Sequence, residues 1–267
     1  MIWLRWVGAP LLWAALLVLG DLWLYGTPAH PVFLRVEIEL AKTLSAAGML
    51  AAAFSFGRGE YLRRAWLLSA LCMVFLLLRD IMLIPWFETI PLSIDVIRGM
   101  LVVLANASLV WGTFLLSRAW KVAGLKLPGT PIRRHLVFGA AVIWTLLIAG
   151  PAIVSNFQTL LRGDPEGLVG MASSIGDVAA LILIAPLLFT ALALRGGSLS
   201  LPWWLLTASM VGWLFYDATL ELLPYCNASA RSVKLTSEFF RALGCLLGMS
   251  AGLAQASIRR AAIRHPG

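Results

Sequence analysis

Charged side chains are scarce in this sequence. Asp, Glu, Lys and Arg make up 13% of its 267 residues, about half the share found in soluble globular proteins. Hydrophobic residues make up 60%, and the mean hydropathy is +0.88. Too few charged groups remain to cover a surface that faces water, so a water-soluble fold is excluded. The composition predicts an integral membrane protein.

Cysteine and histidine are also rare, with three of each. The cysteines are too scattered for a disulfide framework or a metal cage, and the histidines fall at different predicted membrane boundaries; these residues are Cys72, Cys226, Cys245, His30, His135 and His265. The sequence contains no Gly-x-x-x-x-Gly-Lys phosphate loop and no His-Glu-x-x-His zinc motif. We therefore expect no metal site and no cofactor.

Long apolar runs account for most of the chain. A helix needs about 20 residues to cross a hydrocarbon core of about 30 Å. Eight runs have approximately this length, and they cover residues 6–24, 36–56, 65–87, 96–116, 136–157, 173–194, 203–223 and 235–257. The sequence therefore predicts an all-α integral membrane protein with eight transmembrane helices.

Basic residues are distributed unevenly between the gaps that separate these runs. The N-terminal segment, every second gap and the C-terminal tail hold 13 Lys and Arg residues, whereas the opposite gaps hold four. Cytoplasmic loops of membrane proteins are enriched in Lys and Arg. We therefore expect the inner (plasma) membrane of a cell, with both termini in the cytoplasm. The net charge of +8 is interpreted as this orientation signal, so we expect the lipid bilayer and not nucleic acid as a partner.

Shifted comparisons of the sequence with itself predict an internal repeat. The shift that places Trp66 over Trp203 also aligns Asp80 with Asp217, and similar shifts align Glu39 with Asp177 and Arg98 with Arg241. Two parallel four-helix repeats follow, in residues 1–120 and 135–258, with a basic cytoplasmic linker at 121–134 and a short cytoplasmic tail at 259–267. Chance similarity between leucine-rich helices is the alternative.

Ionisable residues inside spanning helices are functional candidates, because they are costly to place in a membrane. The predicted helices contain seven acids and four bases: Glu37, Glu39, Lys42, Arg79, Asp80, Arg98, Asp177, Asp217, Glu221, Glu238 and Arg241. Where the chain enters a helix from the outer side, these charges fall in the first turns. We therefore expect all eleven in the outer half of the membrane.

The excess of acids predicts a water-accessible, acidic cavity that opens to the outer side. We expect a ligand-binding set of Glu39, Asp80, Arg98, Asp177, Asp217, Glu221 and Arg241. Asp80 is expected near Arg98, and Asp217 near Arg241, as equivalent ion pairs in the two repeats. Alternatively, such pairs only fix the register of the helices and contact no ligand.

Two short motifs resemble known membrane proteins. Gly176-Asp177, Leu194-Arg195-Gly196-Gly197 with Pro202-Trp203, and Asp217 at the end of the next helix resemble the multi-pass membrane sensor regions that precede histidine kinase and diguanylate cyclase domains in bacteria and archaea. The resemblance covers roughly 70 to 90 residues and implies detection of a signal within or outside the membrane. Because about ten residues follow the last apolar run, we expect output through a separate signalling protein.

The second motif pairs two aspartates. Ser174-Ile175-Gly176-Asp177 and Phe215-Tyr216-Asp217 resemble the Gly-x-Gly-Asp and Tyr-Asp motifs of intramembrane aspartyl proteases. Their order here is reversed, Ser174 replaces the first glycine, and no Pro-Ala-Leu motif occurs. Two carboxyls that share a proton could activate water.

Three functions therefore remain open. The first is a non-enzymatic membrane protein that binds a small or lipidic ligand, or senses protonation, in the outward-facing cavity and signals through a partner. The second is a secondary transporter of a small cationic or proton-coupled solute. The third is an intramembrane aspartyl hydrolase, which requires Asp177 and Asp217 to meet.

Overall fold

The computed structural model describes residues 2–82, 94–164, 166–195 and 197–264. In these residues the chain forms ten α-helices, one 3-10 helix and no strand: α1 (Ile2–Leu24), α2 (Ala29–Phe54), α3 (Tyr61–Ile81), α4 (Ile94–Ser117), α5 (Ala119–Val122), α6 (Pro131–Leu161), α7 (Glu166–Ile182), α8 (Ile184–Ala193), α9 (Ser200–Leu222), η2 (Leu223–Cys226) and α10 (Ala230–Arg264). The end of the predicted run 65–87, beyond Met82, lies outside the described residues.

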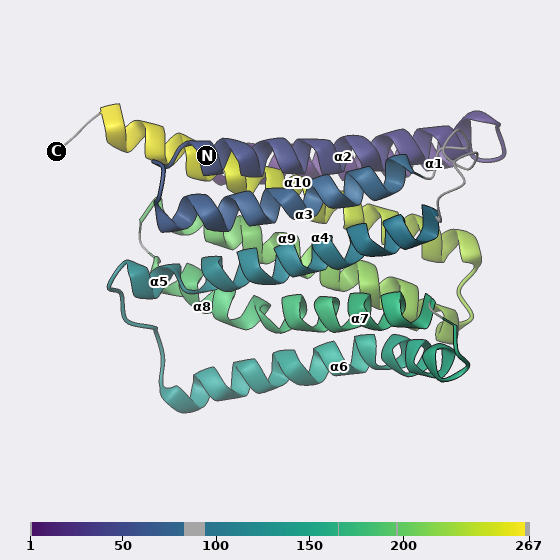
Figure 1. The fold of residues 1–267 in the computed structure, drawn as a ribbon. Coiled ribbons are helices and arrows are strands. Elements are labelled where there is room, and N and C mark those ends of the chain that lie inside the picture. Colours follow the sequence, from purple (N-terminus) through teal and green to yellow (C-terminus); the bar gives the residue numbers. More distant parts are fainter. Residues whose placement is uncertain (1, 83–93, 165, 196, 265–267) are drawn as a thin grey trace.

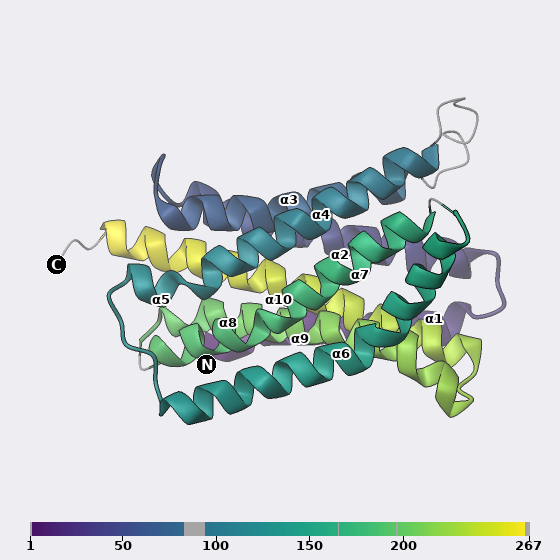
Figure 2. The same cartoon turned by 60° about the horizontal axis from the view of Figure 1, so that its bottom comes forward.

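The long helices lie side by side in one bundle (Figures 1 and 2). Both chain termini lie at the same end, called here the terminus end, and α2 and α10 begin at the opposite end, called the far end. α7 and α8 continue one another and are separated only by Leu183. The interruption closely precedes Pro186, and proline lacks the N–H that would bond the carbonyl four residues back.

Six helical segments are long and apolar enough to cross a membrane: Arg5–Leu24, Tyr61–Ile81, Val96–Ser117, Pro131–Leu161, Gly167–Ala193 and Ala230–Ala262. These six helices, in an all-helical structure, confirm the prediction of an all-α membrane protein. α2 and α9 are of similar length, with 26 and 23 residues, but are not among the six. Both pack along α10.

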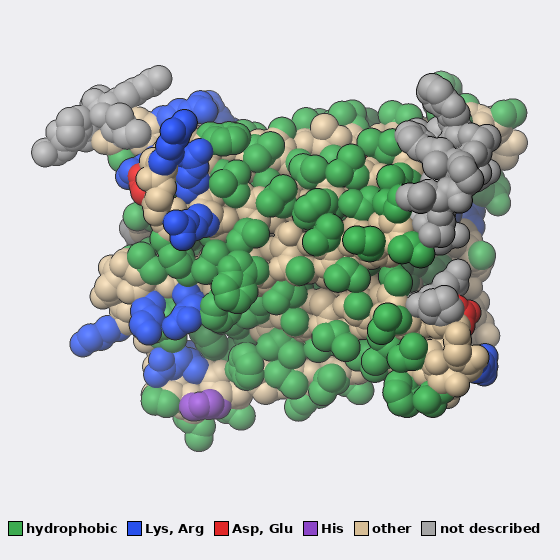
Figure 3. Space-filling model, in the orientation of Figure 1, with side chains coloured by type: hydrophobic (Ala, Val, Ile, Leu, Met, Phe, Trp, Pro, Cys, Tyr) green, Lys and Arg blue, Asp and Glu red, His purple; other side chains and the backbone are tan. Residues whose placement is uncertain are grey.

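The outer surface matches a lipid environment. Figure 3 shows mostly hydrophobic side chains between the two ends of the bundle and Lys and Arg side chains gathered at the terminus end. Leu12 on α1 and Trp144 on α6 are 64% and 60% exposed, which is unfavourable in water but not in a hydrocarbon core. The separation of apolar belt and basic end follows the pattern that the sequence predicted.

Three helices begin nearer the far end than the apolar runs indicated. α2 begins at Ala29, α7 at Glu166 and α10 at Ala230, whereas the runs began at residues 36, 173 and 235. The residues before each run remain helical because a helix satisfies its own backbone hydrogen bonds at a membrane boundary. Asp177 consequently lies in the second half of α7, far from its first turn at Glu166. For Asp177, the expectation that it falls in the first turns of its helix is wrong.

Glycines let α10 approach its neighbours closely. A Cβ added at Gly252 would lie 2.2 Å from the backbone oxygen of Gly48 on α2. A Cβ at Gly212 on α9 would lie 3.0 Å from the Cα of Gly244 on α10. Since α10 also packs against α1, one hydrophobic core includes residues from both predicted halves of the chain.

Candidate functional site

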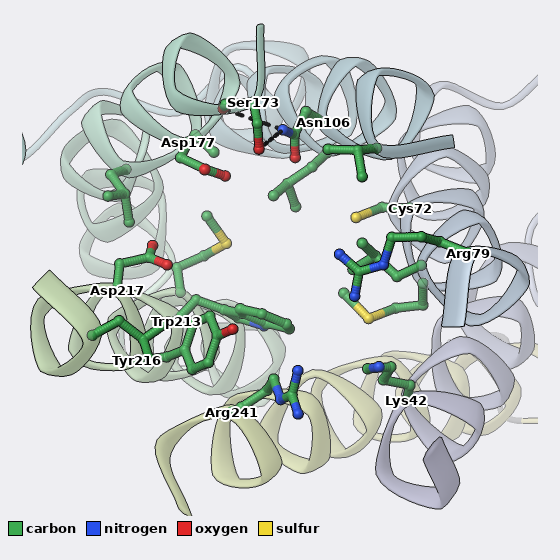
Figure 4. A pocket seen from close by; sticks show the side chains of 18 residues that line it. Lys42, Cys72, Arg79, Asn106, Ser173, Asp177, Trp213, Tyr216, Asp217 and Arg241 are labelled. Carbon is green, nitrogen blue, oxygen red and sulfur yellow. Dashed lines mark hydrogen bonds between the residues drawn. The ribbon is translucent and has the colours of Figure 1, made fainter. Parts of the chain in front are cut away.

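A cavity of about 240 Å³ lies inside the bundle and is lined by α2, α3, α4, α7, α9 and α10. Figure 4 shows polar side chains pointing into it from different sides of the ring of helices. Two of its lining residues, Asn106 on α4 and Cys72 on α3, lie close to the midpoints of their helices. This cavity, called here the central cavity, is therefore near the middle of the bundle along its long axis.

Two carboxyl groups share one side of the central cavity. Asp177 comes from α7 and Asp217 from α9, and both point into the cavity (Figure 4). Among the described residues, neither has an ion-pair partner. An ionised carboxylate inside a bilayer is costly without a compensating charge. These two acids are the strongest candidates to contact a ligand or share a proton.

Three cations point into the central cavity from other sides, and each already has a carboxylate partner. The ion pairs are Lys42 with Glu39 and Asp80, Arg79 with Asp80, and Arg241 with Glu238. Arg79 Nε donates to Asp80 Oδ1 over 2.6 Å, and Arg241 Nε donates to Glu238 Oε2 over 2.7 Å. The three cations and three acids balance in charge.

Polar and aromatic groups complete the lining. Asn106 Nδ2 donates to the backbone oxygen of Ser173 over 3.2 Å and to its Oγ over 3.3 Å, which joins α4 to α7. The rings of Trp213 and Tyr216 pack edge to face with centroids 5.5 Å apart. The Arg241 guanidinium lies 5.4 Å from the Tyr216 ring centroid. These contacts hold the lining side chains in defined positions.

A second cavity of about 580 Å³ adjoins the central cavity, with which it shares Arg79 and Arg241. Its lining includes Pro31 near the start of α2 and Lys234 near the start of α10. Both helices begin at the far end of the bundle, so this adjoining cavity lies between the central cavity and that end. Its lining carries acidic and basic side chains, so it is a polar space on the far side of the central cavity.

The predicted ligand set divides into three groups. Asp177, Asp217 and Arg241 line the central cavity together. Glu39 and Asp80 line the adjoining cavity. The remaining two, Arg98 and Glu221, line neither of these two cavities. The structure thus brings together the residues of helices α7, α9 and α10 but not the whole predicted set.

Both predicted ion pairs are replaced by others. Asp80 pairs with Lys42 and Arg79 rather than with Arg98, because Lys42 on the neighbouring α2 reaches it across the helix interface. Arg241 pairs with Glu238, which lies one turn before it on α10. This local partner leaves Asp217 without the cation that the sequence comparison assigned to it.

The predicted set omitted several lining residues. Lys42 and Arg79 are charges within predicted spans, but the predicted ligand set does not contain them. Their sequence signal is the proximity of acids, with Glu39 one helical turn before Lys42 and Asp80 directly after Arg79. Tyr216 belongs to the predicted Tyr-Asp motif, and Asn106 is a polar residue within an apolar helix, but neither position is assigned to the ligand set. Nothing in the sequence distinguishes Trp213 from a packing residue.

No metal site is found among the residues that the structure describes, because they contain no group of three or more His, Cys, Asp or Glu side chains able to hold an ion. The chemistry available in the central cavity is therefore that of two carboxyls, three paired cations and two aromatic rings. No protein-family model, curated protein or solved structure matches the chain.

Proposed function

We propose that this protein is a multi-pass membrane sensor that binds a small ligand in the central cavity and passes the resulting change to a separate partner protein. The observation that carries this proposal is the pair of acids without an ion-pair partner, Asp177 and Asp217, inside a cavity of about 240 Å³ in the described part of the chain. Ionisable groups at membrane depth without a charged partner favour a role in binding. The adjoining cavity supports access from the far end.

The topology belongs to the same proposal. Eight spans, in two parallel four-helix repeats, would include α2 and α9 beside the six apolar segments and would treat α7 and α8 as one span. The basic terminus end would then face the cytoplasm of the cell's inner membrane. α7 carries Asp177 and continues through α8 to the terminus end, where Thr190 donates to the backbone oxygen of Ser117 over 2.7 Å. A movement at Asp177 would be transmitted to the partner through α7 and α8.

Access to the central cavity tests the proposal directly. Asp217→Cys, with Cys72, Cys226 and Cys245 replaced by serine, should react with a small membrane-impermeant thiol reagent added from the far side. Leu205→Cys is the matched control, because Leu205 lies on the same helix α9 but is 2% exposed and does not line the cavity. Labelling of position 217 from the terminus side alone, or at the slow rate of the control, contradicts the proposal.

Binding is favoured over transport by the side chains toward the terminus end. Trp66, Leu205 and Leu246, which lie beyond the cavity on α3, α9 and α10, are apolar and at most 2% exposed. Transport needs alternating access from both sides. In the described part of the chain these packed side chains separate the central cavity from the terminus end.

An intramembrane hydrolase is the second candidate, favoured by the entry of Asp177 and Asp217 into one cavity from different helices. Two aspartates that share a proton can activate water toward a peptide bond. Cleavage of a fluorogenic membrane peptide that is lost in both Asp177→Asn and Asp217→Asn would establish this activity. The sensor proposal expects no cleavage above that of Asp217→Asn.

A further inference from the structure

Three cations and two acids line the central cavity. Each of these cations already has an acidic partner: Lys42 pairs with Glu39 and Asp80, Arg79 with Asp80, and Arg241 with Glu238. Asp177 and Asp217 are the two lining acids that have no ion-pair partner in the described part of the chain. When both are ionised, no ion pair compensates these two negative charges, and they favour a positively charged group between them.

Aromatic rings lie on the Asp217 side of the central cavity. Trp213 and Tyr216 are on the same helix as Asp217, and Figure 4 shows them between Asp217 and Arg241. The face of a tryptophan or tyrosine ring attracts a cation, and the attraction is stronger where water is excluded. Carboxylates combined with aromatic faces form a site suited to an ammonium group.

The rest of the lining selects an organic cation over a bare metal ion. Met73, Leu76, Leu181 and Met210 present apolar surface that would contact alkyl groups. Calcium and magnesium ions instead require several oxygen ligands, and the described residues contain no group of three acids, cysteines or histidines for a metal. The volume of about 240 Å³ accommodates a small molecule rather than a drug-sized one.

We propose that the central cavity binds a small organic ammonium ion, with its charged nitrogen between Asp177 and Asp217 and its alkyl part against Met73 and Met210. This inference rests on the proposed function, since it names the ligand class of the same cavity. The Arg79 and Arg241 guanidinium groups keep N–H donors beyond those in their ion pairs, and these can hydrogen-bond an uncharged acceptor on the ligand.

Three probes of matched size and different charge test the ligand class. The full chain in phosphatidylglycerol nanodiscs is titrated calorimetrically with n-butylammonium, butyramide and butyrate. We expect saturable binding of n-butylammonium and at least tenfold weaker binding of the neutral and anionic probes. This comparison uses the wild-type protein, so it does not depend on the folding of any variant.

Asp177→Asn and Asp217→Asn should each weaken n-butylammonium binding at least tenfold, because each removes a negative charge with little change of shape. Glu60→Gln is the matched control, since Glu60 pairs with Arg259 at the terminus end, remote from the cavity. Its affinity for n-butylammonium should stay within twofold of the wild type. Equal weakening in all three variants overturns the assignment to the central cavity.

The remaining outcomes separate this inference from the proposed function. Absence of n-butylammonium binding overturns the ammonium site. Butyrate binding that is lost in Arg241→Gln also overturns the ammonium site, but it supports a ligand-binding cavity. The proposed cavity itself is overturned only if position 217 is inaccessible to thiol reagents.

The ammonium group of a ligand can belong to a free amine or to a lipid headgroup. Weaker n-butylammonium binding in nanodiscs with phosphatidylethanolamine supports the site with a lipid source, and unchanged binding supports it with a free amine.

Discussion

Asp21 on α1 connects three segments of the chain at the far end. Its carboxyl lies 2.7 Å from His30 Nε2 at the start of α2 and accepts a 3.0 Å hydrogen bond from Arg231 Nη2 at the start of α10. The Arg231 guanidinium also lies 3.5 Å from the centroid of the Tyr25 ring. With Asp21 only 2% exposed, these contacts satisfy a buried charge.

Asp21→Asn should therefore lower the free energy of unfolding by about 1–3 kcal/mol, because a charged hydrogen-bond acceptor is lost from a buried site. Glu60→Gln is the control, since its ion pair with Arg259 is about 40% exposed and such pairs contribute about 1 kcal/mol or less. Reversible unfolding in mixed micelles measures both variants. An Asp21→Asn protein as stable as Glu60→Gln would show that the cluster contributes little.

At this scale the sequence indicates which ionisable residues lie within helices better than it indicates their partners. The cost of charge in a membrane gives eleven candidates, and Asp177 and Asp217 are two of them that face the central cavity. The partner of Arg241 depends on side-chain reach, and Glu238 on the same helix face is nearer than any residue that a repeat alignment proposes. Lys42 reaches Asp80 across a helix interface, which no single-sequence pattern contains.

The contact between α2 and α10 depends on the absence of side chains. At Gly252 a methyl group would meet the Gly48 backbone, which cannot rotate away as a flexible side chain can. Gly252→Ala should lower the free energy of unfolding by about 1–3 kcal/mol through overpacking, despite the intrinsic preference of alanine for helix. Thermal unfolding of the reconstituted protein measures this change.

Gly139 on α6 provides the matched control, because a Cβ there meets nothing within 4 Å. Gly139→Ala should leave stability unchanged or raise it by up to about 1 kcal/mol through helix propensity. If Gly252→Ala instead stabilises the protein as much as Gly139→Ala does, the close approach of α2 and α10 is not needed for folding.

Helix positions follow from hydropathy, but helix ends do not. Each of the eight apolar runs corresponds to a helix, or to the α7 and α8 pair, in the described residues. The starts of α2, α7 and α10 precede the runs by between one and two helical turns, since residues at the membrane boundary stay helical whether or not they are apolar. Hydropathy marks where a helix is apolar, whereas hydrogen bonding decides where it begins.

At the scale of the whole molecule, the two ends of the bundle differ in charge. The difference in charge between alternate gaps is counted over many Lys and Arg residues, so an error in one helix boundary does not change it. The lining of the central cavity cannot be predicted from the sequence in this way. It depends on side chains from six helices that are far apart in sequence, so it follows only from the packing, whereas the sequence predicts an acidic cavity that opens to the outer side.

The native cysteines allow the orientation of the bundle to be tested with few changes. Cys226 in η2 is exposed at the far end, whereas Cys72 and Cys245 are 1% exposed. If the far end faces outward, a membrane-impermeant maleimide should label the wild-type protein on intact cells, and Cys226→Ser should remove that signal.

Ser198→Cys, placed in the Cys226→Ser protein, adds an exposed thiol to the segment between α8 and α9 at the terminus end. It should then react only after the cells are opened, because the Lys- and Arg-rich end of a membrane protein is generally retained in the cytoplasm. Labelling of position 198 on intact cells, with Cys226 protected, would invert the orientation and with it the side from which the adjoining cavity is reached.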